Sequence, residues 1–218
     1  MTIRVLLADD QDIIRAGLTT LLNSQPGIEV VGQAADGREA VLLAGQLQPD
    51  VCLFDIRMPH LDGVEATRLL AGPDVEHPLA VVVITTFDTD EHVRGALRAG
   101  ARGFLLKDSG PELLAQAIHA AAQGDALIAP RVTGRLLATF ADSPSTEQRS
   151  RRIVSLTDRE EEVVVAVARG LTNAEIATEL YISLSTVKSH LASLMNKIDV
   201  RNRVQIVIWA YESKRVRP

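Results

Sequence analysis

Five polar residues in the N-terminal half of the chain could together perform phosphoryl chemistry. Three are acids, one carries a hydroxyl and one is a lysine: Asp9, Asp10, Asp55, Thr85 and Lys107. Carboxylates that meet in one place repel one another and need a cation, and hard oxygen ligands with open water positions suit Mg²⁺. A carboxylate beside such a cation can attack phosphorus, while a lysine and a hydroxyl can hold the transferred oxygens. The residue types therefore predict a magnesium-dependent phosphoryl-accepting site.

These residues stand at the ends of predicted β-strands. Apolar, β-rich runs alternate with segments of helical periodicity, which predicts a parallel sheet with helices on both faces. In such a sheet the functional site lies at the carboxyl ends of the strands, so we expect the five residues to meet there. The predicted strands are 4–8, 28–33, 51–54, 80–85 and 103–106, and the predicted helices are 12–22, 37–47, 63–70, 90–99 and 111–123.

Each acid taken alone has a simpler interpretation. Single acids at strand ends are usually solvated loop residues or helix caps, and we interpret Asp12 and Asp108 in this way. That explanation becomes weak for a set whose members all stand at the ends of predicted strands. Cys52 is the only cysteine, so it cannot form an intrachain disulfide, which fits a reducing compartment.

Charge divides the chain into two parts. Residues 1–130 hold 9 basic and 18 acidic residues, a net charge of −9, whereas residues 131–218 hold 14 and 10, a net charge of +4. The basic part is the candidate for nucleic-acid binding, because neutralising phosphates needs cations, although chance differences between domains would look the same. We predict domains at 1–124 and 153–218. Residues 125–152 between them are expected to hold a short helix opening at Pro130 and a polar linker.

The second domain is predicted to be all helical. Two threonines are each followed three residues later by a glutamate, the pattern of a capping box that opens a helix. A serine precedes the third predicted helix, and a fourth follows it. The capping boxes are Thr157 with Glu160 and Thr172 with Glu175, the serine is Ser183, and the last two helices are 184–198 and 202–213.

The helix predicted at 184–198 has one apolar face and one face suited to DNA. At 100° per residue, its apolar residues fall on a narrow face that must pack inward. The opposite face carries short or cationic residues and no acid, so it can enter the major groove, and nearby cations can meet phosphates. A solvated amphipathic helix would show the same pattern. The inward residues are Val187, Leu191, Leu194 and Ile198; the groove residues are Ser185, Lys188, Ser189, Ala192 and Asn196; the phosphate-binding cations are Lys197, Arg201 and Arg203.

The motifs VLLADDQ, CLFDIRMPHLDG, VVVITT and GFLLKD resemble those of the receiver domain of bacterial response regulators, over about residues 1–124. The resemblance implies that Asp55 accepts a phosphoryl group from a sensor histidine kinase and becomes a 4-aspartylphosphate. It also implies that Asp10, Asp55 and the backbone carbonyl of Arg57 ligate Mg²⁺, with Asp9 acting partly through water.

The same resemblance gives roles to residues of the later strands. Thr85 and Lys107 would bind the phosphoryl oxygens. Phe104 matches the aromatic switch position before the lysine, where the family often has tyrosine. Because phenylalanine has no hydroxyl, any switching would depend on ring packing, and a plain core aromatic is the alternative interpretation.

The segment LTDREEEVVVAVARGLTNAEIATELYISLSTVKSHLASLMNKIDVRNR resembles the LuxR-type helix-turn-helix domain of NarL/FixJ regulators. The resemblance places the motif at 172–191, with Thr186, Val187 and Lys188 at the start of the recognition helix, and it suggests dimer contact at the last helix. The expected DNA contacts are Thr172, Ser185, Thr186, Val187, Lys188, Ser189, Lys197, Arg201 and Arg203.

We therefore expect a flavodoxin-like, five-stranded α/β receiver domain followed by an all-α, four-helix LuxR-type domain. The expected function is that of a DNA-binding transcriptional response regulator of a two-component system, activated by phosphorylation of Asp55, and not an enzyme. The expected partners are a sensor histidine kinase, double-stranded DNA and, after phosphorylation, a second copy of the chain. The N-terminal run MTIRVLLADDQD is too short and too acidic for a signal peptide or a membrane span, so we expect a cytoplasmic protein without membrane contact.

Three other functions remain as alternatives. An aspartyl-phosphate phosphatase could use Asp9, but such enzymes space their acids as D-x-D, whereas Asp9 and Asp10 are adjacent. A DNA-binding protein whose receiver is a phosphate-independent dimerisation module would not need the complete set of acids, threonine and lysine. An RNA-binding output would use aromatic stacking platforms, which we do not find in residues 153–218.

Overall fold

A computed structural model describes residues 2–86, 90–128, 155–200, 202–213 and 215–216 of the chain. The chain divides into two compact units, Met1–Arg135 and Leu136–Pro218. The helix predicted to open at Pro130 and the predicted polar linker, 142–152, lie outside the described residues. None of the helices in the described parts has the length and apolarity that a membrane crossing requires.

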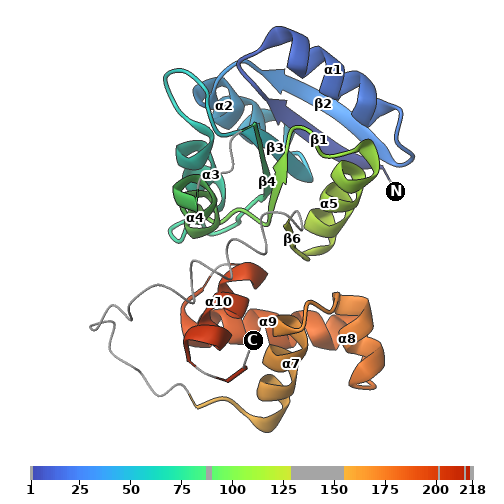
Figure 1. Cartoon of the computed structure of the whole chain (residues 1–218), viewed down its shortest axis with the longest axis vertical. Coiled ribbons are helices and arrows are strands. Elements are labelled where there is room, and N and C mark those ends of the chain that lie inside the picture. Colours follow the sequence, from blue (N-terminus) through green and yellow to red (C-terminus); the bar gives the residue numbers. More distant parts are fainter. Residues whose placement is uncertain (1, 87–89, 129–154, 201, 214, 217–218) are drawn as a thin grey trace. The chain divides into compact units, whose positions relative to one another are not determined.

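The first unit is built on a parallel sheet whose five main strands match the predicted runs. Its strand order is β2-β1-β3-β4-β5-β6 (Figure 1), and the first five follow the order of flavodoxin-like sheets. A short sixth strand, which the sequence did not predict, pairs in parallel with β5 at the sheet edge. The strands are β1 (Ile3–Ala8), β2 (Ile28–Ala34), β3 (Val51–Asp55), β4 (Ala80–Thr85), β5 (Gly103–Leu106) and β6 (Leu127–Ile128).

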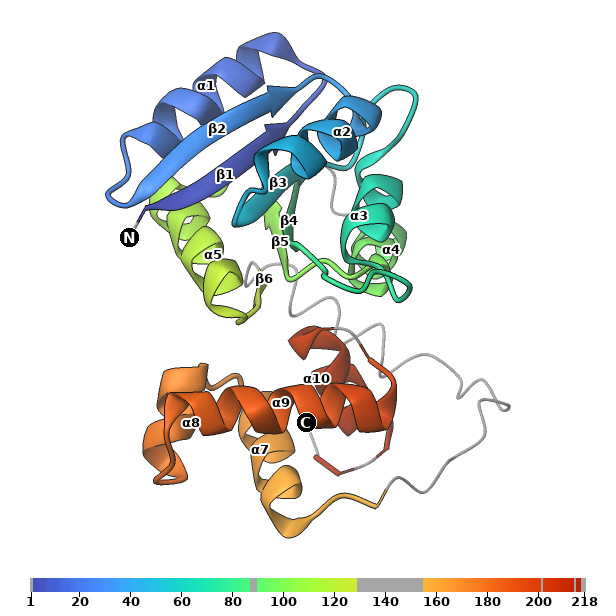
Figure 2. The same cartoon turned by 180° about the vertical axis from the view of Figure 1, so that it is seen from behind.

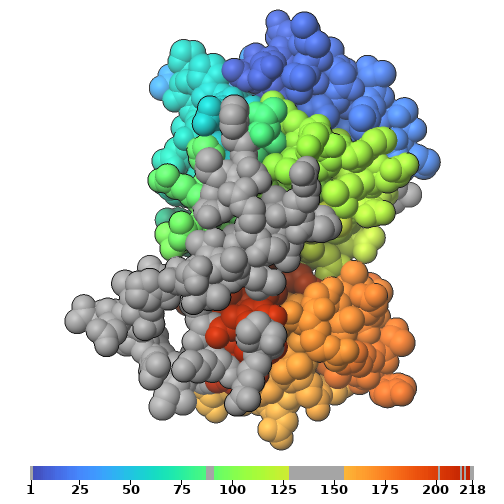
Figure 3. Space-filling model, in the orientation of Figure 1, coloured from blue at the N-terminus to red at the C-terminus, as the bar shows by residue number. Residues whose placement is uncertain are grey.

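Helices cover both faces of this sheet. Helices α1 and α5 contact each other on one face, whereas α2, α3 and α4 follow one another on the opposite face. Figure 3 shows α1 and α5 side by side at the surface of this unit, in blue and yellow-green. The helices are α1 (Asp12–Asn23), α2 (Gly37–Leu47), α3 (Gly63–Ala71), α4 (Asp90–Ala99) and α5 (Pro111–Gln123).

The central strands β3, β4 and β5 are buried along their whole length. Strands covered by helices on both faces must be apolar throughout, and the runs VCLFD, AVVVIT and GFLL meet this requirement except at the chemical residues. Local signals fix the helix starts: the Asp36 and Asp62 side chains accept hydrogen bonds from the third residues of α2 and α3. The polar residues therefore stand at the carboxyl ends of strands whose other residues form the apolar core.

The second unit consists of four described helices, α7 (Asp158–Ala168), α8 (Asn173–Glu179), α9 (Leu184–Ile198) and α10 (Arg203–Glu212). Both predicted capping boxes form, at Thr157 with Glu160 and at Thr172 with Glu175. Figure 2 shows α9, the longest of the four, with α7, α8 and α10 around it. The buried apolar residues of all four helices make a single core, and Trp209 packs partly buried against it.

Candidate functional site

Three carboxylates meet at the carboxyl ends of β1 and β3. The two strands are neighbours, and the chain order of the sheet reverses between them, which leaves a crevice at their ends. Asp9 follows β1 directly and Asp55 is the last residue of β3. One oxygen each of Asp9, Asp10 and Asp55 lies within 4.8 Å of the others. Asp9 and Asp55 are buried, whereas Asp10 is exposed.

Lys107 enters this cluster from the end of β5. Its Nζ atom lies 2.9 Å from Asp55 Oδ2 and 2.6 Å from Asp9 Oδ2. The Lys107 backbone amide donates to the carbonyl of Thr85, at 2.8 Å, so the ends of β4 and β5 are joined. The predicted acids and lysine are therefore close together, as the positions of the strands require.

The cluster has more negative than positive charge. Burial raises the pKa of the Asp55 carboxyl, and the Lys107 ammonium opposes that rise only in part. Burial also disfavours the charge of Lys107, but its hydrogen bond to Asp55 and its close contact with the Asp9 carboxylate outweigh this effect and raise its pKa. Three carboxylates facing one ammonium carry an excess negative charge that suits a divalent cation.

Asp9 carries the clearest sign of an incomplete site. Its Oδ2 atom is buried and accepts no hydrogen bond of good geometry from the described residues. Lys107 Nζ is close enough for attraction, and we interpret this contact as an ion pair whose direction is poor for a hydrogen bond. Buried oxygens are almost always satisfied, so the donor set fits a hard cation beside Asp9, Asp10 and Asp55.

The backbone holds Asp55 in one orientation. Its Oδ1 atom accepts a hydrogen bond from the Ile56 amide at 2.8 Å, which directs Oδ2 toward Lys107. At the start of α3, Gly63 donates to the Ile56 carbonyl at 2.9 Å. A Cβ atom on Gly63 would lie only 2.0 Å from the carbonyl oxygen of Asp55. Glycine at this helix start is thus required by the close approach of two backbone segments.

Thr85 and Phe104 lie on the neighbouring strands β4 and β5. Thr85 ends β4 and is 1% exposed, and the adjacent Ile84 pairs with Asp55 across the sheet. Phe104 pairs with Val83 and is completely buried. The placement of Thr85 fits a hydroxyl donor near Asp55. The complete burial of Phe104 agrees with the alternative interpretation, a plain core aromatic. Its role as a switch stays a prediction.

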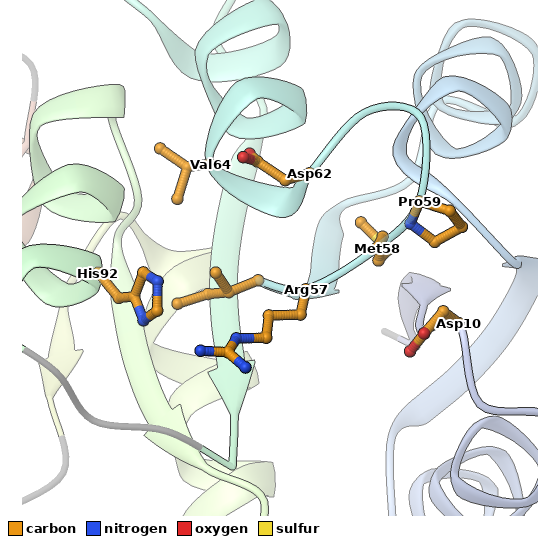
Figure 4. A pocket seen from close by; sticks show the side chains of 8 residues that line it. Asp10, Arg57, Met58, Pro59, Asp62, Val64 and His92 are labelled. Atoms are coloured by element: carbon orange, nitrogen blue, oxygen red, sulfur yellow. The ribbon is translucent and has the colours of Figure 1, made fainter.

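A pocket of about 420 Å³ opens beside the acidic cluster. Figure 4 shows Asp10 on one side of it, Arg57 below, and His92 of α4 opposite. Asp62 and His92 were not expected at this place from the sequence. Asp62 was detectable as the cap of α3, but nothing local in the sequence brings His92 here. The residues that line the pocket are Asp10, Ile56, Arg57, Met58, Pro59, Asp62, Val64 and His92.

The second candidate site is the exposed face of α9. The four residues predicted to pack inward are all buried, and the five predicted on the opposite face are all exposed. The Ser183 side chain accepts a hydrogen bond from the Thr186 amide and so begins the helix. No acid lies in the first turn of α9, so its N-terminal end is open to an anion.

Three of the expected DNA contacts have other partners within the described part of the second unit. Val187 is completely buried, so its side chain belongs to the core. Arg203 is 9% exposed and donates to the Asn173 side chain and the Leu171 carbonyl, which makes it a support for α8. Lys197 pairs with the buried carboxylate of Glu160 at 2.7 Å, so its charge is already balanced. Arg201 lies outside the described residues.

Comparison with known proteins assigns a family to each unit. A family model described as the response regulator receiver domain matches residues 5–119. A second, described as bacterial regulatory proteins of the luxR family, matches residues 154–210.

Similar proteins extend over nearly the whole chain. Transcriptional regulatory protein LiaR of Bacillus subtilis is 40% identical over 211 residues, which cover 97% of this chain and 98% of LiaR. Response regulator protein VraR of Staphylococcus aureus is 35% identical over 214 residues, with the same coverage. The solved structure of ChrA, a response regulator in a heme-sensing two-component system, is 34% identical, covers 99% of each chain and has a TM-score of 0.54.

Proposed function

The chain belongs to the LuxR family of two-component transcriptional response regulators, and on this premise we propose that phosphorylation of Asp55 controls DNA binding by α9. The observation that carries the proposal is the position of Asp55. It is buried at the end of β3, 2.9 Å from Lys107 Nζ and beside two further carboxylates. The family and fold expected from the sequence are confirmed by these matches; the roles of individual residues are proposed here.

Asp55 is suited to accept a phosphoryl group. A carboxylate oxygen attacks the phosphorus of a phosphohistidine on the sensor kinase; the new P–O bond forms as the P–N bond breaks, and the leaving imidazole takes up a proton from water. Lys107 and the Thr85 hydroxyl hold the transferred oxygens. The aspartyl phosphate adds a charge of about −1.5 to −2, which draws Lys107 toward the new group. This movement shifts the equilibrium between two conformations of the receiver surface.

A magnesium ion fits the acidic cluster. Asp9, Asp10, Asp55 and the backbone carbonyl of Arg57 would hold it, and the buried Asp9 Oδ2 that lacks a hydrogen-bond donor supports this assignment. When bound, Mg²⁺ would neutralise charge on the transferred phosphoryl group. The chain's own residues orient Asp55, through the Ile56 amide, and exclude water from its buried face.

The exposed face of α9 is suited to read DNA. Lys188 is the cation of this face, and Ser185, Thr186 and Ser189 offer short hydroxyl groups beside it. Such side chains fit the major groove, in which lysine commonly contacts guanine. Thr172, whose hydroxyl is occupied in a capping box, would present the N-terminus of α8 to a phosphate.

Phosphorylation is proposed to pair two copies of the chain on DNA, in the cytoplasm and without catalytic turnover of a substrate. The alternative of a phosphatase that uses Asp9 is disfavoured by the contact between Asp9 and Lys107, because a general acid or base needs a free path to the substrate. Rapid hydrolysis of phosphomonoesters by the purified chain would support that alternative.

Labelling tests the acceptor. With acetyl phosphate and Mg²⁺, the wild-type chain should take up one phosphoryl group and Asp55→Asn none. Asp50→Asn is the matched control, because Asp50 lies just before the opposite end of β3, where it binds the Arg4 amide. Equal labelling of Asp55→Asn and the wild type would contradict the assignment.

Titration on two duplexes tests the reading helix. Lys188→Ala should lower the affinity for a duplex that the wild type selects from a random pool, by about 1–3 kcal/mol if the lysine contacts a guanine. The affinity for a scrambled duplex should change much less. Unchanged affinity for both duplexes would show that α9 does not read the DNA.

A further inference from the structure

Helix α8 ends in a left-handed turn that is occupied by a tyrosine. The backbone of Tyr181 has a φ of 54°. The Ile182 amide returns to the Ala177 carbonyl at 3.0 Å, and the Tyr181 amide to that of Thr178 at 3.4 Å. Hydrogen bonds of this kind close a helix with one residue in the left-handed region, where glycine or asparagine is usual. A side chain with a Cβ atom costs free energy at this position.

Packing of the Tyr181 side chain does not offset this free-energy cost. The residue is 95% exposed, and its side chain makes no hydrogen bond or ring contact with the rest of the described chain. Gln48, at the end of α2, is different. It has a φ of 48°, and its side-chain amide donates back to the Ala44 and Gly45 carbonyls. Helix α7 is followed by a glycine, Gly170, with a φ of 84°. The domain thus holds an exposed aromatic ring where glycine would fit better.

Tyr181 lies in the turn that leads into the proposed DNA-reading helix. Tyr181 is two residues before Ser183, which caps α9. Leu184, the first residue of α9, is also exposed, at 46%. The acid closest in sequence is Glu179, and Arg169 neutralises it at 2.7 Å. An exposed hydroxyl on a hydrogen-bonded turn, without an unpaired acid near it in sequence, can approach a phosphate group.

We propose that Tyr181 is a DNA-contacting residue that binds the sugar–phosphate backbone at the edge of the groove entered by α9. Its hydroxyl donates to a phosphate oxygen and its ring covers the adjacent sugar. The contact is independent of base sequence, because phosphates carry no base identity. The inference rests on the proposed DNA binding by α9 and adds a residue that neither the helical wheel nor the family motif assigned.

The predicted signature is a loss of DNA affinity without a loss of stability. The test uses the phosphorylated full-length chain and two duplexes, the one that the wild type selects from a random pool and its scrambled form. Tyr181→Gly should bind both duplexes about tenfold more weakly, the scale of one hydrogen bond to a charged group with its packing. Tyr181→Phe keeps the ring and should lose less. Trp209, the only tryptophan, reports unfolding of the second unit, and its denaturation midpoint in Tyr181→Gly should equal or exceed that of the wild type.

Any of the following results would overturn the proposal. Wild-type affinity of Tyr181→Gly for both duplexes would show that the ring does not touch DNA. A loss on the selected duplex alone would show a base contact instead. A lower denaturation midpoint in Tyr181→Gly and Tyr181→Asn alike would show that the ring supports the fold. If the wild type selects no duplex, the proposed DNA binding itself fails, and this inference fails with it.

Discussion

In the first unit, Lys107 Nζ contacts two of the three clustered carboxylates, those of Asp9 and Asp55. These acids have different positions: Asp9 and Asp55 are buried against the sheet, whereas Asp10 is exposed. An exposed oxygen beside a buried, negatively charged pocket is well placed to bind an incoming cation directly. Lys107, in contrast, repels a cation but attracts a phosphoryl group, so the two residues should contribute to different steps.

We therefore expect Asp10→Ala to lose Mg²⁺ binding and phosphorylation together. Lys107→Ala should keep the metal, because it removes a competing positive charge, but phosphorylation should no longer increase DNA binding. Calorimetric titration with Mg²⁺, followed by labelling with acetyl phosphate, separates the two variants. Loss of metal affinity in Lys107→Ala would contradict this division of roles.

Gly63 allows the start of α3 to lie against the end of β3, where the acceptor Asp55 stands. Because a Cβ atom would lie 2.0 Å from the Asp55 carbonyl oxygen, Gly63→Ala should displace the end of β3. We expect a loss of about 1–3 kcal/mol in the free energy of unfolding of the first unit, with slower phosphorylation. Gly45→Ala is the matched control: Gly45 lies in α2, and beyond the backbone of its own helix and its chain neighbours no atom lies within 4 Å of an added Cβ. Alanine should therefore stabilise the helix by about 0.5–1 kcal/mol. Chemical denaturation followed by circular dichroism would measure both, and equal stability of the two variants would refute the close-approach argument.

At the scale of the elements, a buried carboxylate joins α7 to α9. Glu160 accepts hydrogen bonds from the Thr157 amide at 2.9 Å, from the Ser193 hydroxyl at 2.9 Å and from Lys197 Nζ at 2.7 Å. The Lys197 ammonium and these further donors lower the pKa of Glu160 to about 2. The second half of the proposed reading helix is thus joined to α7 by a charged group in addition to the shared apolar core.

This network should make the stability of the second unit depend on pH. The folded pKa of Glu160, about 2, lies below the ordinary value of 4.5, so its contribution is complete above pH 4.5 and decreases as the pH falls toward 2. Glu160→Gln should lower the free energy of unfolding at pH 7 by about 1–3 kcal/mol, and should remove much of this pH dependence. Trp209 fluorescence during denaturation at several pH values is the measurement.

Glu162→Gln provides the matched control on the same helix. Glu162 is half exposed and pairs only at the surface with Arg159, so its loss should cost about 0–1 kcal/mol. If the two variants were equally stable, Glu160 would not be the link between α7 and α9.

At the scale of the whole molecule, a domain that reads DNA with a single lysine on its groove face should bind weakly alone. Useful affinity then requires two copies on paired half-sites about one helical turn apart. The phosphorylated chain should bind such a duplex much more tightly than the unphosphorylated chain, and the logarithm of affinity should fall with that of salt concentration by about 0.9 per phosphate contact. Fluorescence anisotropy on duplexes with one and two half-sites tests this. Equal affinity for both duplexes would argue against pairing.

Much of this organisation follows from the sequence alone, because it is carried by local periodicity. The apolar runs identify buried parallel strands, and the polar residues that end them must then meet at one sheet edge. In α9, the spacing of Val187, Leu191, Leu194 and Ile198 predicted the buried face, and all four residues are buried. The capping boxes of α7 and α8 are equally local, since each involves residues three apart.

Only the tertiary structure decided which polar side chains pair over long distances. Arg203 and Lys197 looked like phosphate-binding cations, but Arg203 is buried against residues about 30 positions away and Lys197 pairs with Glu160, 37 positions away. His92 reaches the pocket through the packing of α4 against α3, and the short strand β6 forms because β5 offers an open edge. A sequence pattern specifies which face of an element is apolar, but the partner of a charged side chain depends on which elements pack together, and packing is settled only when the whole core forms.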